Sequence, residues 1–469
     1  MRDLVQWVCD EAKRCGADFA DARAGAGDST AITLQDGRAD KLSQSSRRRL
    51  GVRVLKAGAW GFATSEDCTR DGASAALDAA LAMARASEKL PCDLSELAHV
   101  PPVEDSEVLE PELDPRSVPI SQKMADARAF EKAMLDHASE WAANTIVNYS
   151  DSASRTWTAN TRGTLIESVV PRTWLSAVIT VQRDGVRQRW GERKAARCGY
   201  ELVRDAAPAD LSLKAAQIAV SLLDAGPPPS GKMPVVFHPS VTGLFTHEAI
   251  GHNAEADLVL AGESIVEGKL GQAIASDLVT ITDESDHGNS WGSYKYDSEG
   301  TLATRRPLIE HGVLVGFMHS MATAARFGVA PTGSARAQDQ GCRPQVRMSN
   351  TFIEPAEGGI GLEQMIAGID LGLYVKGGQS GYVMCEKGQF TCSVGEGWMI
   401  RDGALAEHVR DVSLNGMTLE TLHNIDMVGS DLSMEWPGMC GKSGQGMPNN
   451  CGGPHIRITE LVVGGLVGI

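Results

Sequence analysis

Three consecutive prolines near the middle of the chain limit its fold more than any other feature of the sequence. They lie at residues 227–229, within the segment Gly-Pro-Pro-Pro-Ser-Gly. Proline cannot continue a helix and cannot donate a hydrogen bond inside a sheet. We therefore expect a linker here that separates residues 1–225 from residues 226–469. The chain has 469 residues, enough for two large domains of this kind or for three of average size.

The two halves carry different patterns of secondary structure. Helical periodicity is found at the N-terminus and in three further segments, residues 75–86, 121–141 and 211–223. Strand-like segments flank the turn sequences Asp36-Gly37 and Asp184-Gly185, which are typical of tight hairpins. Hairpins join antiparallel strands, so we predict an α+β fold whose N-terminal domain is mixed α/β with antiparallel strands. The C-terminal domain is predicted to be strand-rich, with glycine turns and one short helix near residues 362–369.

The charge balance excludes some classes of partner. The chain has 44 Lys and Arg against 60 Asp and Glu, a net charge of −16. Nucleic acids and anionic membranes bind basic surfaces, so we expect neither as a main partner. No apolar run reaches the roughly 18 residues of a membrane helix, and acidic residues interrupt the N-terminal segment where a signal peptide would be apolar. The ten cysteines are scattered, which is typical of reduced thiols. We therefore expect a cytoplasmic protein.

A sequence with metal-binding chemistry follows the linker. Ser240 can cap a helix that carries His247-Glu248-x-x-x-His252. Residues five apart lie about 140° apart around a regular helix, whereas the four-residue spacing of zinc peptidases gives about 40°. The helix must therefore bulge or end before His252, and Gly251 is the residue type that permits such a departure. The alternative interpretation is a structural pair of histidines.

A catalytic zinc ion normally takes three protein ligands and a water molecule, so a third residue must join the two histidines. The spacing leaves six candidates open: Glu255, Asp257, His423, His455, Cys440 and Cys451. Cys440 has the most favourable setting, because the glycines around it predict a turn that can present a thiolate without steric hindrance. The alternative is an inert thiol in a loop.

Segments that occur in order along nearly the whole chain resemble the TldD/PmbA family, and in particular its metal-bearing TldD type. The matching segments are residues 51–55, 60–63, 246–252, 255–257, 331–333, 348–351, 377–379, 428–431, 439–442 and 444–445. Collinear matches of this extent are far more specific than a six-residue motif alone. The intact His-Glu-x-x-x-His motif distinguishes the chain from the related PmbA/TldE type, which lacks it.

The resemblance implies a zinc metallopeptidase whose two domains build an enclosed dimer. His247, His252 and Cys440 would bind Zn²⁺, and Glu248 would be the general base that activates zinc-bound water. The substrates would be unfolded or extended peptides, and the partner either a second copy or a metal-free TldE/PmbA-type subunit. The family also has a historical link to DNA gyrase, which the negative charge of this chain disfavours. The remaining alternative is a non-catalytic, metal-stabilised subunit or scaffold of a TldD/TldE-like complex.

Two further features concern the substrate. Gly377-Gly378-Gln379 either offers an exposed strand edge to which an extended peptide adds, and so binds substrate, or forms a hairpin turn, which a glycine pair favours. Asn253 and Ala256 stand where the family usually has glycines around the acidic residue after the motif. Because these residues differ from the family pattern, the substrate preference can differ as well, and a specialised role in peptide maturation or natural-product biosynthesis is one alternative.

Overall fold

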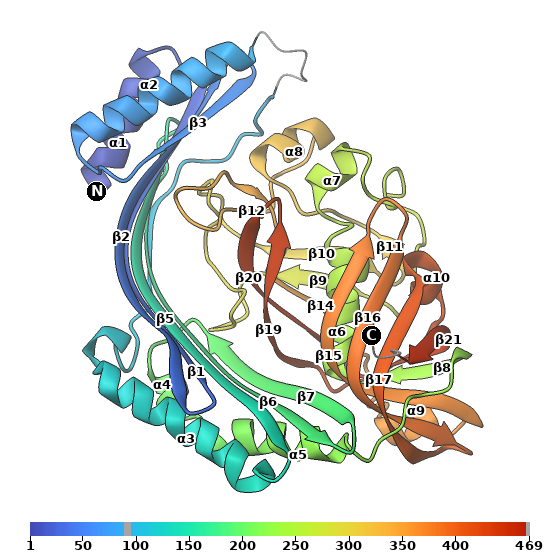
Figure 1. Ribbon diagram of the computed structural model, residues 1–469. Helices are drawn as coiled ribbons and strands as arrows, with labels where there is room; N and C mark the ends of the chain where they lie inside the picture. Colours follow the sequence, from blue (N-terminus) through green and yellow to red (C-terminus); the bar gives the residue numbers. More distant parts are fainter. Residues whose placement is uncertain (89–94, 466–469) are drawn as a thin grey trace.

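The computed structural model describes residues 1–88 and 95–465, and it has the predicted α+β fold. Its N-terminal part builds one curved sheet and the helices that pack on it (Figure 1). The elements of this part are α1 (Arg2–Arg14), β1 (Phe19–Gln35), β2 (Arg38–Lys56), β3 (Ala59–Ser65), α2 (Arg70–Ser87), β4 (Glu104–Val108), the 3₁₀ turn η1 (Pro115–Ser117), α3 (Ile120–Ala138), β5 (Ala142–Asn160), β6 (Leu165–Arg183), β7 (Val186–Ala196), α4 (Glu201–Arg204), the π-helical turn η2 (Ala209–Leu213) and α5 (Lys214–Ser221).

The N-terminal sheet has the strand order β3-β2-β1-β5-β6-β4, and β7 also pairs with β6. The long strands β1, β2, β5 and β6 sweep in an arc around the C-terminal part (Figure 1). Asp36-Gly37 and Asp184-Gly185 form the predicted tight turns, with φ of 47° and 75° in the first and 52° and 82° in the second. The predicted antiparallel hairpins β1–β2 and β6–β7 are therefore confirmed.

Two groups of helices cover this sheet through separate cores. α1 and α2 pack on β1 and β2 through Val5, Val8, Leu77 and other buried residues. α3 and α5 pack on β5 and β6 around Phe130 and Met134. The helix predicted at residues 211–223 begins instead as the π-helical turn η2 and continues as α5.

The C-terminal part contains two six-stranded sheets with α6 between them (Figure 1). Its elements are β8 (Gly231–Phe237), α6 (Pro239–Thr246), the π-helical turn η3 (His247–Gly251), α7 (Ala256–Leu260), β9 (Ile281–Glu284), β10 (Arg305–Glu310), β11 (Val313–Leu314), α8 (Met321–Phe327), β12 (Ala335–Arg336), β13 (Gln345–Val346), β14 (Asn350–Ile353), α9 (Leu362–Ile366), β15 (Leu371–Met384), β16 (Gln389–Arg401), β17 (Ala404–Met417), α10 (Thr418–His423), β18 (Ile425–Val428), β19 (Ser433–Lys442), β20 (Gln445–Gly453) and β21 (Ile456–Gly465).

Helix α6 is the central element of the C-terminal part. One sheet has the order β17-β16-β15-β8-β21-β18 and the other β11-β10-β9-β14-β20-β19. α6 contacts β15 of the first sheet and β14, β19 and β20 of the second, and all eight of its residues are buried. Burial on every side fixes its position, so the residues that follow it are presented from a rigid support.

The sheets do not mix strands across the proline segment. The N-terminal sheet draws its strands from residues 19–196, and the described strands of the other sheets come from residues 231–465. We therefore propose residues 1–225 and 226–469 as two domains. A buried ion-pair cluster joins them, because Arg53 lies 2.6 Å from Asp21 and 2.9 Å from Glu299. No helix within the described ranges combines the length and the apolar character needed to cross a membrane.

Candidate active site

The start of α6 is fixed by a histidine. β8 ends at Phe237, and His238 then caps the helix by accepting the backbone N–H of Ser240 at 3.2 Å. The prediction that Ser240 is the cap is therefore wrong. Its hydroxyl instead accepts the backbone N–H of Gly377 at 3.0 Å and so ties the helix to β15. Pro239 occupies the first helical position, where a missing N–H costs nothing.

The predicted break before His252 is a π-helical turn. η3 spans His247–Gly251, and the N–H of His252 donates to the carbonyl of His247 at 3.2 Å. A π turn takes more residues than an α turn, so residues five apart return to the same face. The two imidazole rings accordingly lie 5.0 Å apart. Gly251 is required for another reason than the predicted one, since a Cβ there would lie 2.0 Å from Sδ of Met348.

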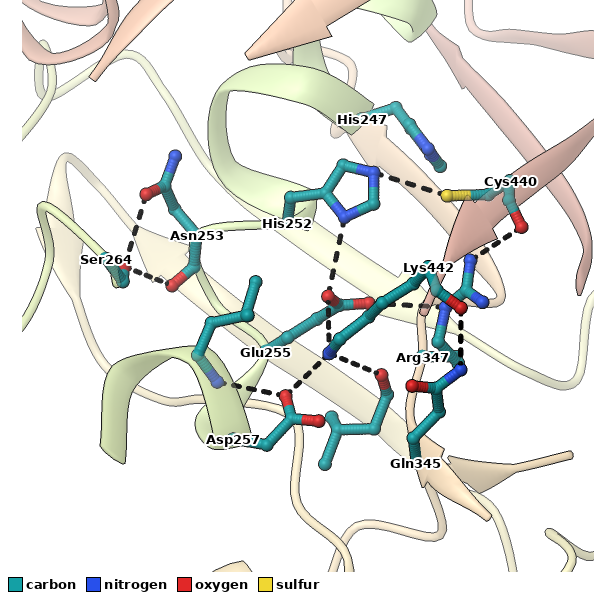
Figure 2. A network of polar contacts seen from close by, with 12 residues as sticks. His247, His252, Asn253, Glu255, Asp257, Ser264, Gln345, Arg347, Cys440 and Lys442 are labelled. Atoms are coloured by element: carbon teal, nitrogen blue, oxygen red, sulfur yellow. Dashed lines mark hydrogen bonds and ion pairs between the residues drawn. The ribbon is translucent and has the colours of Figure 1, made fainter. Parts of the chain in front are cut away.

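Cys440 joins the two histidines. It lies on β19, and ligand atoms of His247, His252 and Cys440 all lie within 4.8 Å of one another (Figure 2). The Sγ of Cys440 is 3.2 Å from Nε2 of His252. One thiolate and two imidazoles are donors that suit zinc, and three protein ligands leave a position for water.

The other candidates for third ligand serve other contacts. Glu255 and Asp257 bind Lys442, at 2.9 Å and 2.7 Å. His455 pairs with Asp431 at 2.5 Å, and Cys451 points its thiol at the carbonyl of Trp436. His423 is exposed at the end of α10.

Electrostatics favour a thiolate at Cys440. Burial raises the pKa of this thiol, but the adjacent His247 and His252 outweigh burial and lower it to about 4. Burial also opposes the charged form of His252, yet Glu255 and Cys440 together raise its pKa well above the ordinary value. In the metal-free site these shifts favour a thiolate at Cys440 beside a protonated His252.

A buried carboxylate orients His252. The Nδ1–H of His252 faces Oε2 of Glu255 at 3.4 Å, which leaves Nε2 directed at Cys440. Glu255 is fully buried, and although burial opposes its charge, His252 and Lys442 lower the pKa of its carboxyl to about 2. A carboxylate on the far nitrogen of a ligand imidazole fixes both the ring and its tautomer.

Arg347 connects both sides of the site. It is only 1% exposed, and its guanidinium donates to the carbonyl oxygens of Cys440 at 2.7 Å and Gln445 at 3.3 Å. Its Nε lies 3.6 Å from Glu255 (Figure 2). One side chain thus holds the β19–β20 hairpin against the residue that orients His252.

His247 has its own orienting partner in Asn449. The side-chain Nδ2 of Asn449 lies 3.1 Å from Nδ1 of His247, while its buried Oδ1 has no hydrogen-bond partner. A neutral imidazole that binds a metal through Nε2 carries its hydrogen on Nδ1 and needs an acceptor there. If the side-chain amide of Asn449 is rotated by 180°, its Oδ1 accepts the hydrogen of His247 Nδ1 and is no longer without a hydrogen-bond partner. The residues present therefore fit a metal ion held by His247, His252 and Cys440.

The carboxylate of Glu248 is available to accept a proton. It follows His247 on the π turn, and no hydrogen bond or ion pair joins its carboxylate to any residue within 1–88 or 95–465. Strand β15 passes so close that a Cβ on Gly381 would lie 2.5 Å from Cγ of Glu248. The side chain is held by packing while its oxygens keep their capacity to accept hydrogen bonds.

The segment Gly377–Gln379 is not the hairpin turn that its glycines favour. It lies inside β15, at a bulge between Gly378 and Ser380. β8 pairs with β15 only as far as Val375, so the part of β15 beyond it pairs with β16 alone in the described sheet. Gly377 and Gly378 are buried against α6, where the N–H of Gly377 donates to Ser240, so the exposed part of this edge begins at Gln379 and runs toward Gly381 and Glu248.

We predict that Cys440 of the metal-free protein reacts with iodoacetamide at nearly the same rate at about pH 6 and pH 8. With a pKa of about 4 the thiolate is fully formed at both values. An ordinary thiol with a pKa near 9 would change its reactive fraction about a hundredfold. Peptide mapping by mass spectrometry separates Cys440 from the partly exposed Cys68, which serves as the internal control. A steep rise at Cys440 would contradict the prediction.

The chain matches models of a known family of metallopeptidases. Models of the PmbA/TldA metallopeptidases match residues 20–84 (domain 1), 113–223 (central domain) and 230–465 (C-terminal domain). A metalloprotease of Methanothermobacter thermautotrophicus is 38% identical over 452 residues, 96% of each chain.

Solved structures share the fold over the whole chain. A putative modulator of a DNA gyrase from Thermotoga maritima has a TM-score of 0.78 at 23% identity and covers 98% of this chain and 99% of its own. TldE from Thermococcus kodakarensis has a TM-score of 0.77 at 17% identity, with coverage of 98% and 100%. Since both the family models and a relative that spans nearly the full length match, this chain belongs to the PmbA/TldD metallopeptidase family.

Proposed function

We propose that this protein is a zinc-dependent peptidase that hydrolyses peptide bonds in unfolded or extended peptides. The observation that carries the proposal is the convergence of His247, His252 and Cys440 next to Glu248, whose carboxylate has no partner among the described residues. A purely structural metal site needs the three ligands but has no use for Glu248. The name of the metalloprotease relative supports the same activity.

In this proposal His247, His252 and Cys440 hold the zinc ion, and Glu248 handles protons. A bound zinc ion supplies a Lewis acid that polarises water and the peptide carbonyl. Glu248 accepts the proton of the attacking water and returns it to the leaving amine. Glu255 and Asn449 keep the two imidazoles in the ligand orientation throughout.

The open edge of β15 supports extended peptides as substrates. A peptide that adds to this edge at the exposed Gln379, next to the buried Gly377 and Gly378, would run toward Glu248. Main-chain hydrogen bonds would hold it without regard to most side chains, and only an unfolded segment can pair in this way. We therefore propose Gly377, Gly378 and Gln379 as part of the substrate site.

We further propose a cytoplasmic protein that dimerises, with a second copy or with a metal-free subunit of the TldE/PmbA type. The likeness in fold to TldE supports a partner of this shape. The net charge of −16 argues against nucleic acid as the ligand. A dedicated step in peptide maturation or natural-product biosynthesis fits a peptidase of this kind.

Metal analysis with peptide digestion tests the proposal. We expect about one zinc ion per chain in the wild type, and loss of most of it in His247→Ala, His252→Ala and Cys440→Ser. Chelation is expected to abolish cleavage of an unstructured peptide library, and added zinc to restore it. Full zinc content in Cys440→Ser, or cleavage that survives chelation, would overturn the assignment.

A further inference from the structure

A large cavity lies where the N-terminal sheet meets the strands of the metal site. Its volume is about 750 Å³, and its walls include Trp190 and Arg193 of β7, Gly377 of β15 and Trp436 of β19. A second cavity of about 300 Å³ shares these four residues and extends to Gln379. Both cavities therefore border β15 at Gly377, and the smaller one reaches the exposed edge at Gln379.

Arg193 and Lys194 of β7 line the larger cavity, and neither side chain has an acidic partner among the described residues. Arg193 packs its guanidinium over the ring of Trp436 at 4.5 Å, and its buried Nε has no hydrogen-bond partner. Neither Arg193 nor the neighbouring Lys194 has an ion pair with any described side chain.

The acidic groups nearby do not neutralise these two cations. Glu192 accepts the indole N–H of Trp190 at 3.0 Å and binds Lys214 at 3.2 Å. Asp210 lies exposed at the cavity wall. The described side chains that line the cavity thus carry a surplus of positive charge, in a chain whose net charge is −16.

The burial of Arg193 makes this surplus costly. Burial lowers the pKa of its guanidinium, and the neighbouring groups offset this effect only in part. Arginine nevertheless stays charged in proteins, so the unpaired group retains a strong preference for an anion. A planar guanidinium stacked on an indole is well placed to bind a carboxylate with two parallel hydrogen bonds.

Two strands place the cavity at a similar distance from the metal site. On β19, Trp436 precedes Cys440 by four residues, and on β15, Gly377 precedes Gly381 by four, where Gly381 touches Glu248. At about 3.3 Å per residue this is about 13 Å along β19, and it is shorter along β15, whose bulge lies between these residues. An extended peptide spans that distance with about four residues.

We propose that this cavity is a subsite for a carboxylate of the peptide, about four residues from the scissile bond, with Arg193 and Lys194 as its binding groups. The inference rests on the proposed peptidase function and deepens it, because it makes peptides with an acidic group at this distance the preferred substrates. The carboxylate is either an Asp or Glu side chain or the C-terminal carboxylate of a short peptide.

Binding measured without turnover tests the subsite. We would use the zinc-loaded Glu248→Gln protein and fluorescence anisotropy with labelled extended peptides. The peptides carry Glu or Gln at each position three to five residues from the cleaved bond, with a free or an amidated C-terminus. We expect one acidic peptide to bind about tenfold more tightly than its neutral counterpart. A difference between the Glu and Gln peptides would identify a side-chain carboxylate, and a difference between the free and amidated peptides would identify the C-terminal carboxylate.

Charge-removing variants assign the effect to the cavity. Added to the same background, Arg193→Gln or Lys194→Gln is expected to reduce the tenfold preference to about twofold or less, and raised salt to weaken it. Arg187→Gln is the matched control, because Arg187 lies exposed on the same strand and lines neither cavity. Its preference is expected to stay unchanged.

The outcomes separate this inference from the peptidase proposal. Equal affinity for acidic and neutral peptides, or a preference that survives both Arg193→Gln and Lys194→Gln, overturns the subsite even if the wild type cleaves peptides. A preference that depends on Arg193 in a protein whose wild type cleaves nothing would keep the subsite as a binding site and reject the peptidase function.

Discussion

Glu248→Gln is expected to reduce peptide cleavage by about a thousandfold and to leave the zinc content unchanged. Glutamine has the same shape but cannot accept the proton of the attacking water, and a positioned general base contributes about 10²–10⁴ in rate. The fold should tolerate the change, because no hydrogen bond or ion pair joins the carboxylate of Glu248 to a described residue. Initial rates on an unstructured peptide, with metal analysis of the same preparation, measure both quantities.

Glu386→Gln provides the control for this variant. Glu386 is an exposed acid in the turn that follows β15, so it tests the loss of one negative charge near the site without loss of the base. Its rate is expected to match that of the wild type. Full cleavage by Glu248→Gln with zinc retained would show that this glutamate is not the base and would favour the structural scaffold.

The π turn was predictable from the sequence because it follows from helix geometry alone. Two ligands five residues apart cannot converge from a regular α-helix, so a distortion had to occur between His247 and His252. The reason for Gly251 was not predictable, because the atom that excludes a side chain there belongs to Met348, nearly 100 residues away. The local backbone geometry can be predicted from neighbouring residues, whereas a close contact between segments that are distant in the sequence cannot.

The ligand set shows the same limit. Spacing alone left Glu255, His455 and Cys440 open as third ligands, and the structure brings only Cys440 into the cluster with His247 and His252 among the described residues. Glu255 lies close as well, but its Oε2 accepts a hydrogen bond from Lys442, and its carboxylate is paired with Arg347 at 3.6 Å. Whether a residue is a candidate ligand or a partner of another side chain depends on the contact between β13 and β19. This contact cannot be predicted from the spacing of residues in the sequence.

The prediction of a hairpin turn at residues 377–379 is wrong for a related reason. A glycine pair usually marks a turn, but here Gly377 lies inside the strand β15. A Cβ at this position would fall 2.1 Å from the ring of Trp190, so the packing excludes any side chain. The contact joins β15 to the N-terminal sheet. Glycine at 377 is therefore favoured by packing between the two parts of the chain and by the left-handed backbone beside the bulge, where φ is 73°.

Lys442→Met is expected to destabilise the protein by about 3–5 kcal/mol and to weaken zinc binding about 10- to 100-fold. Lys442 binds Glu255 at 2.9 Å and Asp257 at 2.7 Å beside the site. Its loss leaves the fully buried Glu255 carboxylate short of its main cation, and removal of one partner of a buried pair is costly. A displaced Glu255 also releases His252. Urea unfolding and competition with a zinc chelator measure the two effects.

The double variant Glu255→Gln with Lys442→Met separates stability from metal binding. Once the buried charge is gone, most of the stability should return, whereas zinc affinity should stay low because no carboxylate orients His252. Lys232→Met is the matched control: its ion pair with Glu460 at 2.7 Å is exposed, so its loss should cost about 1 kcal/mol or less. If Lys442→Met lost no more stability than Lys232→Met and kept full zinc affinity, the buried network would have no part in holding the site.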